Sequence, residues 1–350
     1  MRQGGATPEA ASDERRVLIP TRISPPPFFG TLRTFAVKDL GGATMGTTWS
    51  LKVAVAPGTD LAPLNSGIEA VLARIVDEMS PWERGSHISR FNTAPAGTWH
   101  RLPEGLFKVL STTLHWAERT DSAYDPTIGA AVNLWGFGPD TSRQGIPQRN
   151  AIDVARGRSG WQRLALDHER KRALQPGGLL LDLSSIAKGF AVDEVVRFLR
   201  GRGIGNLLVE IGGELRGEGL KPDGTPWWVE LEQPRGARHA AAPPATLLAL
   251  TGLSVATSGD ERRYFDAEGR RYAHTLDPAT GAPVRHDLVS VTVAAEDCMT
   301  ADAAATALTV LGPERGPAFA AKHGLAARFV RLNDHGLTEH LSPAMAAMLD

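Results

Sequence analysis

Strand-like and helix-like stretches alternate along this chain without a regular repeat, and this irregular order constrains the fold more than any other feature. Between Thr47 and Val55, apolar residues occupy every second position, which predicts a half-buried strand. From Ile68 to Met79, apolar residues recur at helical spacing instead. Because the elements follow no strand–helix–strand period and hairpins are frequent, we predict an α+β fold of mixed, mainly antiparallel sheets with flanking helices.

Capping residues indicate where the first two helices begin and end. Ser66 and Glu69 have the spacing of a capping box, so the first helix is expected to begin there and to end at Ser80-Pro81. The second helix is expected to begin at Pro103, since proline is favoured in the first turn.

The remaining elements are predicted from periodicity and turn residues. Pro176-Gly177-Gly178 predicts a hairpin turn between strands at 171–175 and 179–183. A helix at 300–311 is expected to end at Gly312-Pro313. We also expect a helix at 186–200 and strands at 163–166, 206–211, 227–232, 253–257, 271–276 and 289–295.

The length of 350 residues is typical of two domains, or of one large domain with insertions. Residues 1–33 are polar, end near three consecutive prolines and lack periodicity, which predicts a mobile N-terminal arm. Residues 34–350 are expected to form the folded domain, in which two subdomains are possible, with a Gly- and Pro-rich linker from Gly136 to Pro147.

Composition argues against several classes of function. A net charge of -1 provides no basic field for nucleic acid. With one cysteine, Cys298, the chain has no internal disulfide and no cysteine-based zinc site; this residue is a buried small side chain or a nucleophile. No stretch has the roughly 20 apolar residues of a transmembrane segment. As written, the chain lacks a signal peptide or lipid anchor, so we expect it in the cytoplasm, or in the periplasm if the true start lies upstream.

A polar cluster from Asp182 to Gly189 lies where an apolar strand leads into a helix. Free backbone N–H groups and the helix dipole suit an anion at such a corner. The alternative is that Asp182 and Ser184 only cap the helix. Lys188 in the first helical turn is unfavourable for the dipole, and an anionic ligand would explain it.

Two further clusters carry weaker signals. Gly212 and Gly213 follow a strand, where they either allow close approach to a ligand or form a turn or bulge. His274 and Asp277 lie near the exposed end of another strand, where functional groups often lie, although a structural histidine and a simple Asp-Pro turn also account for them.

Asp302 and Thr306 are four residues apart on a helix that otherwise consists of alanine and apolar residues. Their oxygens therefore point the same way from an apolar background, where an unpaired charge is unfavourable. Oxygen ligands without nitrogen or sulfur suit Mg²⁺ bound together with substrate phosphates. The alternative is that Thr306 bonds back to its own helix while Asp302 caps it.

Together, these motifs resemble the ApbE family of FAD:protein FMN transferases from about Thr44 to Gly312. The ordered set makes the resemblance specific. It comprises Met45-Gly46-Thr47-Thr48, Met79-Ser80-Pro81-Trp82, Ser89-Arg90-Phe91-Asn92, Tyr124-Asp125-Pro126-Thr127-Ile128-Gly129, Asp182 to Gly189, Ile211-Gly212-Gly213, Thr257-Ser258-Gly259-Asp260, His274 to Gly281, and Ala301-Asp302 with Thr306.

The resemblance implies two sets of site residues. Mg²⁺ would be held against the FAD pyrophosphate by Asp302, Thr306 and a backbone oxygen of the 184–187 turn, most suitably that of Ser185. Family members more often have tyrosine at the position of Trp82, and either ring can stack on a flavin or adenine. The implied FAD contacts are Met45, Trp82, Ala123, Tyr124, Asp125, Asp182, Lys188 and Thr275.

The implied reaction is Mg²⁺-dependent transfer of FMN from FAD to a Thr or Ser hydroxyl of an acceptor protein, with release of AMP. His274 is the candidate general base, because a reference pKa of about 6.5 suits this role near neutral pH. A Mg²⁺-dependent FAD pyrophosphatase would use the same site with water as the acceptor. A non-catalytic FAD-binding protein would not need the metal ligands.

Overall fold

The computed structural model describes residues 15–21, 32–140, 145–234, 243–259, 263–334 and 336–350, so part of the predicted 136–147 linker, most of the predicted arm and Asp260 lie outside the described residues. Its centre is an eight-stranded sheet in which every neighbouring pair is antiparallel, as predicted. In spatial order the strands are β18 (Gly336–Leu341), β17 (Ala326–Asn333), β16 (Leu288–Ala295), β11 (Leu253–Gly259), β8 (Glu214–Glu218), β7 (Leu207–Ile211), β3 (Thr47–Val55) and β2 (Ala36–Thr44).

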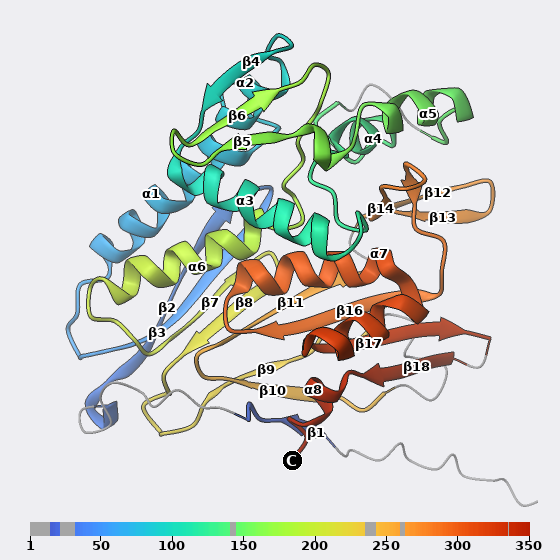
Figure 1. Ribbon diagram of the computed structural model, residues 1–350. Helices are drawn as coiled ribbons and strands as arrows, with labels where there is room; N and C mark the ends of the chain where they lie inside the picture. Colours follow the sequence, from blue (N-terminus) through green and yellow to red (C-terminus); the bar gives the residue numbers. More distant parts are fainter. Residues whose placement is uncertain (1–14, 22–31, 141–144, 235–242, 260–262, 335) are drawn as a thin grey trace, which may run out of the picture.

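Four long helices cover one face of this sheet (Figure 1). Three of them place an apolar stripe against the strands, for example Ile68, Leu72 and Ile75 of the first helix, and the helix at 104–119 packs on two of these helices. Together they form the main hydrophobic core. The helices are α1 (Ala62–Met79), α3 (Glu104–Arg119), α6 (Ala187–Arg200) and α7 (Cys298–His323). No described helix is long and apolar enough to cross a membrane.

A second, smaller core lies on the opposite face of the sheet, where β1 (Arg16–Leu18), β10 (Thr246–Leu250), β9 (Trp227–Glu230) and α8 (Pro343–Ala346) pack. The predicted mobile arm does not extend over Arg16–Leu18, which pairs in parallel with β10. Leu18 is fully buried, and Arg16 contacts both carboxylate oxygens of Glu339 at 2.5 and 2.6 Å. Three residues are too few for a periodic signal, so this strand depends on tertiary contacts.

Most of the remaining elements lie above the helices or beside the right-hand end of the sheet, and the short helix at 32–34 lies at the start of β2 (Figure 1). They are the short helices η1 (Leu32–Thr34), α2 (His87–Asn92), α4 (Gly129–Leu134), α5 (Arg149–Gly157) and η2 (Trp161–Arg163), the sheet of β4 (Thr98–Arg101), β6 (Arg172–Gln175) and β5 (Ala165–Asp167), and the hairpins β12 (Tyr264–Ala267) with β13 (Arg270–Ala273) and β14 (Leu276–Asp277) with β15 (Ala282–Pro283).

The predicted hairpin between 171–175 and 179–183 is wrong. β6 pairs with β4 and β5, and residues 179–183 contribute only one bridge, from Leu180 to Ile128. The turn does form, but the Gln175 side-chain amide bonds to both the N–H and the carbonyl of Leu179, at 3.3 and 3.0 Å. This amide occupies the backbone groups that a strand partner would use.

Two helix boundaries also differ from the prediction. The capping box at Ser66 is wrong, because α1 begins at Ala62, whose N–H donates to Asp60, and includes Ser66 in its interior. In α7, Gly312 adopts a positive φ of 80° and breaks the helix as predicted, but helical structure resumes and reaches His323. The predicted end at Ser80 and the start after Pro103 are confirmed.

Candidate active site

Two tight turns lie side by side at one end of the central sheet. Met45-Gly46 joins β2 to β3, and Gly212-Gly213 joins β7 to β8. All four residues have positive φ, and the Gly212 N–H donates to the carbonyl of Thr48 at 3.1 Å. Positive φ is uncommon for methionine, and such conformations cluster at functional sites. The structure therefore brings a predicted FAD contact, Met45, beside the glycine pair.

The glycine pair forms a hairpin turn, and Gly212 lies close to the side chains of Thr47 and Lys188. A Cβ at Gly212 would lie 2.9 Å from the Thr47 side chain and 3.3 Å from Cδ of Lys188. The absent side chain leaves room for Lys188, which extends from the first turn of α6 toward the sheet.

Lys188 forms an ion pair that the sequence did not predict. Its Nζ lies 2.5 Å from Oε1 of Glu214, the first residue of β8, whose side chain is buried. Burial lowers the pKa of Lys188, but the carboxylates of Asp302 and Glu214 raise it by more, so the net pKa lies above the ordinary value. Lys188 is therefore a permanent cation at the start of α6.

The turn before α6 does not cap the helix with a side chain of its own. Ile186 occupies the N-cap position, and its side chain makes no capping bond. Asp182 accepts a hydrogen bond from the Ser184 N–H at 2.9 Å, so it caps the turn and not the helix. The Ser185 hydroxyl lies 2.8 Å from the hydroxyl of buried Tyr124, which ties this corner to the 123–127 loop.

Asp302 lies in the second turn of α7, and its carboxylate faces the start of α6. Oδ2 accepts the Gly189 N–H at 3.0 Å, and the residue is only 4% exposed. Burial raises the pKa of Asp302, while the ammonium of Lys188 and the Gly189 N–H oppose this rise. The hypothesis that Asp302 caps its own helix is wrong, because Asp297 is the N-cap of α7.

Thr306 lies one turn beyond Asp302, and its hydroxyl lies 3.1 Å from that of Ser258 near the end of β11. The described residues contain no group of three or more His, Cys, Asp or Glu side chains placed to hold a metal. A cation here would therefore rely on one carboxylate, a hydroxyl and backbone carbonyls. Such an all-oxygen set suits Mg²⁺, which binds few protein ligands and completes its shell with water and phosphate oxygens.

The 123–127 loop is held by its own aspartate. Asp125 accepts the N–H and hydroxyl of Thr127 at 2.8 and 2.6 Å through one oxygen, and the N–H of Trp161 at 3.2 Å through the other. Both carboxylate oxygens thus have partners within the protein. Asp125 fixes the loop that presents Ala123 and Tyr124, which is a structural role.

Arg263, a residue that the sequence analysis did not single out, contacts both Trp82 and His274. The Arg263 guanidinium lies 5.9 Å from the centroid of the Trp82 ring, which is 46% exposed. The carbonyl of Arg263 lies 3.0 Å from Nδ1 of His274. A carbonyl only accepts hydrogen bonds, so Nδ1 carries the proton and Nε2 of the neutral ring is the acceptor. Burial lowers the pKa of His274 to about 4.

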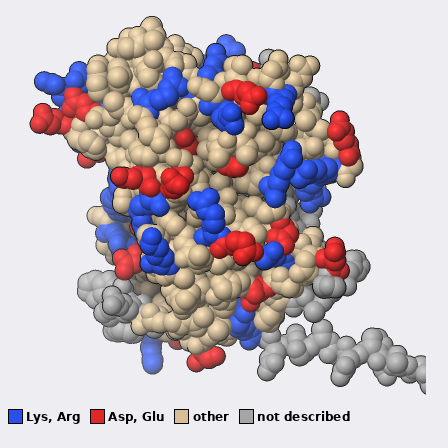
Figure 2. Space-filling model, turned by 45° about the vertical axis from the view of Figure 1, so that its right-hand side comes forward, with Lys and Arg blue, Asp and Glu red and all other residues tan. Residues whose placement is uncertain are grey.

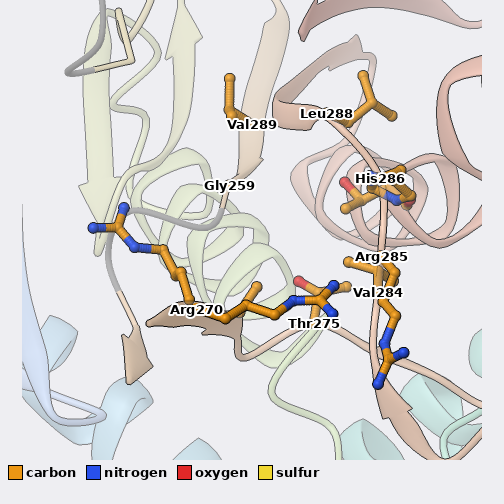
Figure 3. Close-up of a pocket in the computed structure, with 11 residues that line it drawn as sticks. Gly259, Arg270, Thr275, Val284, Arg285, His286, Leu288 and Val289 are labelled. Carbon is orange, nitrogen blue, oxygen red and sulfur yellow. The ribbon is translucent and has the colours of Figure 1, made fainter. Parts of the chain in front are cut away.

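A pocket of about 240 Å³ lies near this region, between the β12–β13 hairpin and the far part of the α7 helix (Figure 3). Thr275, Gly259 and Thr309 line it, which places it one helical turn beyond Thr306. Arg270, Arg271 and Arg285 also line it. In Figure 2 this side of the molecule is turned forward, and a patch of basic side chains is visible at the right, about half-way up. Sequence reasoning missed the three arginines, although they flank the His274 motif.

Comparisons with known proteins show which family this chain resembles over most of its length. The chain matches the ApbE family over residues 45–329. It is 36% identical to the FAD:protein FMN transferase of Vibrio cholerae, covering 89% of this chain and 92% of the relative, and 33% identical to that of Escherichia coli K12, covering 89% of each.

A solved structure extends the similarity to the whole fold. The crystal structure of the Pseudomonas stutzeri flavinyl transferase ApbE in its apo form has a TM-score of 0.82 at 37% identity, covering 90% of this chain and 97% of that one. This agreement confirms the predicted α+β fold, and with the family match over most of the chain it shows that this chain belongs to the ApbE family.

Proposed function

We propose that this chain is a Mg²⁺-dependent FAD:protein FMN transferase that moves FMN to a Thr or Ser hydroxyl of an acceptor protein and releases AMP. One observation carries the proposal. The buried carboxylate of Asp302 bonds to the start of α6 beside the ammonium of Lys188, and the hydroxyl of Thr306 lies one turn beyond Asp302 on α7. This is an environment for a dication and a pyrophosphate together.

The residues divide the task of binding FAD. Asp302, Thr306 and a backbone carbonyl of the 184–187 turn, for which Ser185 is the candidate, would hold Mg²⁺. When bound, Mg²⁺ neutralises charge on the pyrophosphate oxygens. Lys188 supplies a further positive charge, and exposed Trp82 offers a ring for stacking. The remaining candidate FAD contacts are Met45, Ala123, Tyr124, Asp125, Asp182 and Thr275.

The chemistry that the protein itself supplies is positioning and proton transfer. The acceptor hydroxyl oxygen forms a bond to the FMN-side phosphorus, and the bond from that phosphorus to the bridging oxygen breaks. The bridging oxygen keeps the electron pair and leaves as part of AMP. Nε2 of His274 takes the hydroxyl proton, because hydrogen bonding at Nδ1 leaves Nε2 as the free acceptor. No covalent enzyme intermediate is needed.

One assay separates this function from its rivals. The protein is incubated with FAD, Mg²⁺ and an acceptor protein of the Vibrio cholerae relative, and flavin fluorescence is read on a denaturing gel. A transferase gives a fluorescent acceptor band and AMP. A pyrophosphatase gives free FMN and AMP without a band, and a binding protein leaves FAD intact. The same reaction in EDTA tests the need for the metal.

A further inference from the structure

A carboxylate from the second turn of each of the helices α6 and α7 accepts backbone N–H groups in the first turn of the other. Asp193 of α6 accepts the N–H groups of Cys298 and Met299 at 3.0 and 2.9 Å, which are the first two residues of α7. In return, Asp302 of α7 accepts the N–H of Gly189, the third residue of α6. Each helix therefore has part of its N-terminus capped by the other (Figure 1 shows the two ends meeting).

This exchange replaces a local cap at α6 and supplements one at α7. No side chain of its own N-cap residue bonds to the start of α6. The α7 helix has a local cap, since Asp297 accepts the Thr300 N–H at 2.8 Å. The bonds from Asp193 therefore add a connection between helices to an end that is already capped within its own helix.

Asp193 is itself held in place from the sheet. Arg216 of β8 donates to its Oδ1 at 3.0 Å and to Glu218 at 2.7 Å, and its side chain is largely buried. The same carboxylate oxygen of Asp193 thus joins the strand, α6 and the first residue of α7. This connection fixes where α7 begins relative to α6.

The helices α6 and α7 lie so close together at this contact that a movement of one displaces the other. Gly189 and Asp193 are one turn apart on α6, as are Cys298 and Asp302 on α7, so both carboxylate bonds span the same contact. A Cβ at Gly189 would lie 2.3 Å from the carbonyl oxygen of Cys298. A shift of α7 along α6 would therefore move the Asp302 carboxylate directly.

We infer that Asp193 is a positioning residue, which holds the Asp302 carboxylate in place for metal binding by fixing the start of α7 against α6. The inference rests on the proposed function for the role of Asp302 as a metal ligand. Residues that orient ligands typically affect metal affinity about 10- to 100-fold when they are lost.

The test compares two aspartates that accept N–H groups from the start of α7, Asp193 on α6 and the N-cap residue Asp297. Asp193→Ala removes the bonds between helices, and Asp297→Ala removes the local cap. Because Asp193→Ala leaves Arg216 without one of its carboxylates and can unfold the protein, Asp193→Asn is made as well; it keeps the shape and one acceptor. Mn²⁺ binding to the full chain is measured by electron paramagnetic resonance, and hydrogen exchange at residues 187–190 by mass spectrometry.

We expect the two Asp193 variants to weaken Mn²⁺ binding about 10-fold or more and to accelerate hydrogen exchange at 187–190, the first turn of α6. Asp297→Ala should lower the melting temperature with Mn²⁺ affinity unchanged. Wild-type affinity in a folded Asp193 variant, or equal weakening by Asp297→Ala, would overturn the inference.

The exchange measurement separates this inference from the proposed function. If the wild-type protein binds no Mn²⁺, the metal role of Asp302 fails and the inference about metal positioning fails with it. Accelerated exchange at 187–190 in the Asp193 variants would then still establish the link between the helices. If the wild type binds Mn²⁺ but exchange at 187–190 is unchanged, the positioning role alone is refuted.

Discussion

Gly189→Ala tests the closeness of α6 and α7 most directly. The new Cβ would lie 2.3 Å from the carbonyl oxygen of Cys298 and 2.8 Å from Cβ of Asp302, whereas ordinary contacts begin at 3.4 Å. The helices must therefore separate locally by about 1 Å, since interiors are close-packed. That movement would lengthen the 3.0 Å bond from the Gly189 N–H to Asp302 beyond hydrogen-bonding distance.

The expected magnitude follows from three contributions. Overpacking costs about 1–3 kcal/mol, and loss of a hydrogen bond to a carboxylate costs about 1.5–3 kcal/mol. Alanine recovers about 1 kcal/mol through its higher helix propensity. The free energy of unfolding should therefore fall by about 2–5 kcal/mol. A 1 Å displacement of Asp302 should in addition reduce the rate of FMN transfer about 100-fold.

Urea unfolding followed by circular dichroism measures the free energy of unfolding, and the gel assay measures transfer by the folded protein. Gly157→Ala is the matched control, because Gly157 ends α5 and a Cβ there meets nothing within 4 Å. The control should be neutral or stabilising by up to about 1 kcal/mol. A Gly189→Ala protein with wild-type stability and transfer rate would refute the argument.

Four further outcomes are expected. Asp302→Ala should abolish FMN transfer in a folded protein, and a wild-type rate in Mg²⁺ would show that this carboxylate is not a ligand. Because burial lowers the pKa of His274 to about 4, the ring stays neutral down to about pH 5, so kcat/KM should fall only below that pH. A midpoint at or above the ordinary pKa of 6.5 would contradict this. If the arginine-lined pocket binds an anionic part of FAD, Arg285→Gln should raise the KM for FAD about 10-fold. The control Arg101→Gln, at an exposed position of β4, should leave this KM unchanged. The same KM for both variants would show that the pocket does not bind FAD. In thermal shift measurements, FAD should stabilise the protein more than FMN does, and EDTA should reduce the difference; an FAD shift indifferent to EDTA would count against the pyrophosphate–metal site.

The sequence indicated correctly which segments are strands and helices where the periodic signal was long. Thr47–Val55 alternates over nine residues, and the predicted strand matches β3 at both ends. The helix predicted at 186–200 differs from α6 by one residue. Such patterns depend on neighbours two to four residues away, so they are readable without knowledge of the fold. The motifs were also sufficient to indicate the family.

Only the tertiary structure decided which groups the site residues contact. The sequence suggested an anionic ligand near Lys188, and only the structure shows that this side chain also pairs with Glu214. The sequence predicted Asp125 as an FAD contact but not that both of its carboxylate oxygens also hold a loop. Arg263 belongs to none of the sequence motifs, yet it contacts both Trp82 and His274. Each of these depends on strand register or helix packing between distant segments.

The contact between α6 and α7 shows the physical reason. Gly189 and Asp302 are 113 residues apart in sequence, and their bond exists because two helices pack on one face of the sheet closely enough to leave no room for a Cβ. The sequence by itself determined that Asp302 and Thr306 share a helix face, since helical spacing is local. What that face meets was decided by packing, because burial and pairing are properties of the assembled chain.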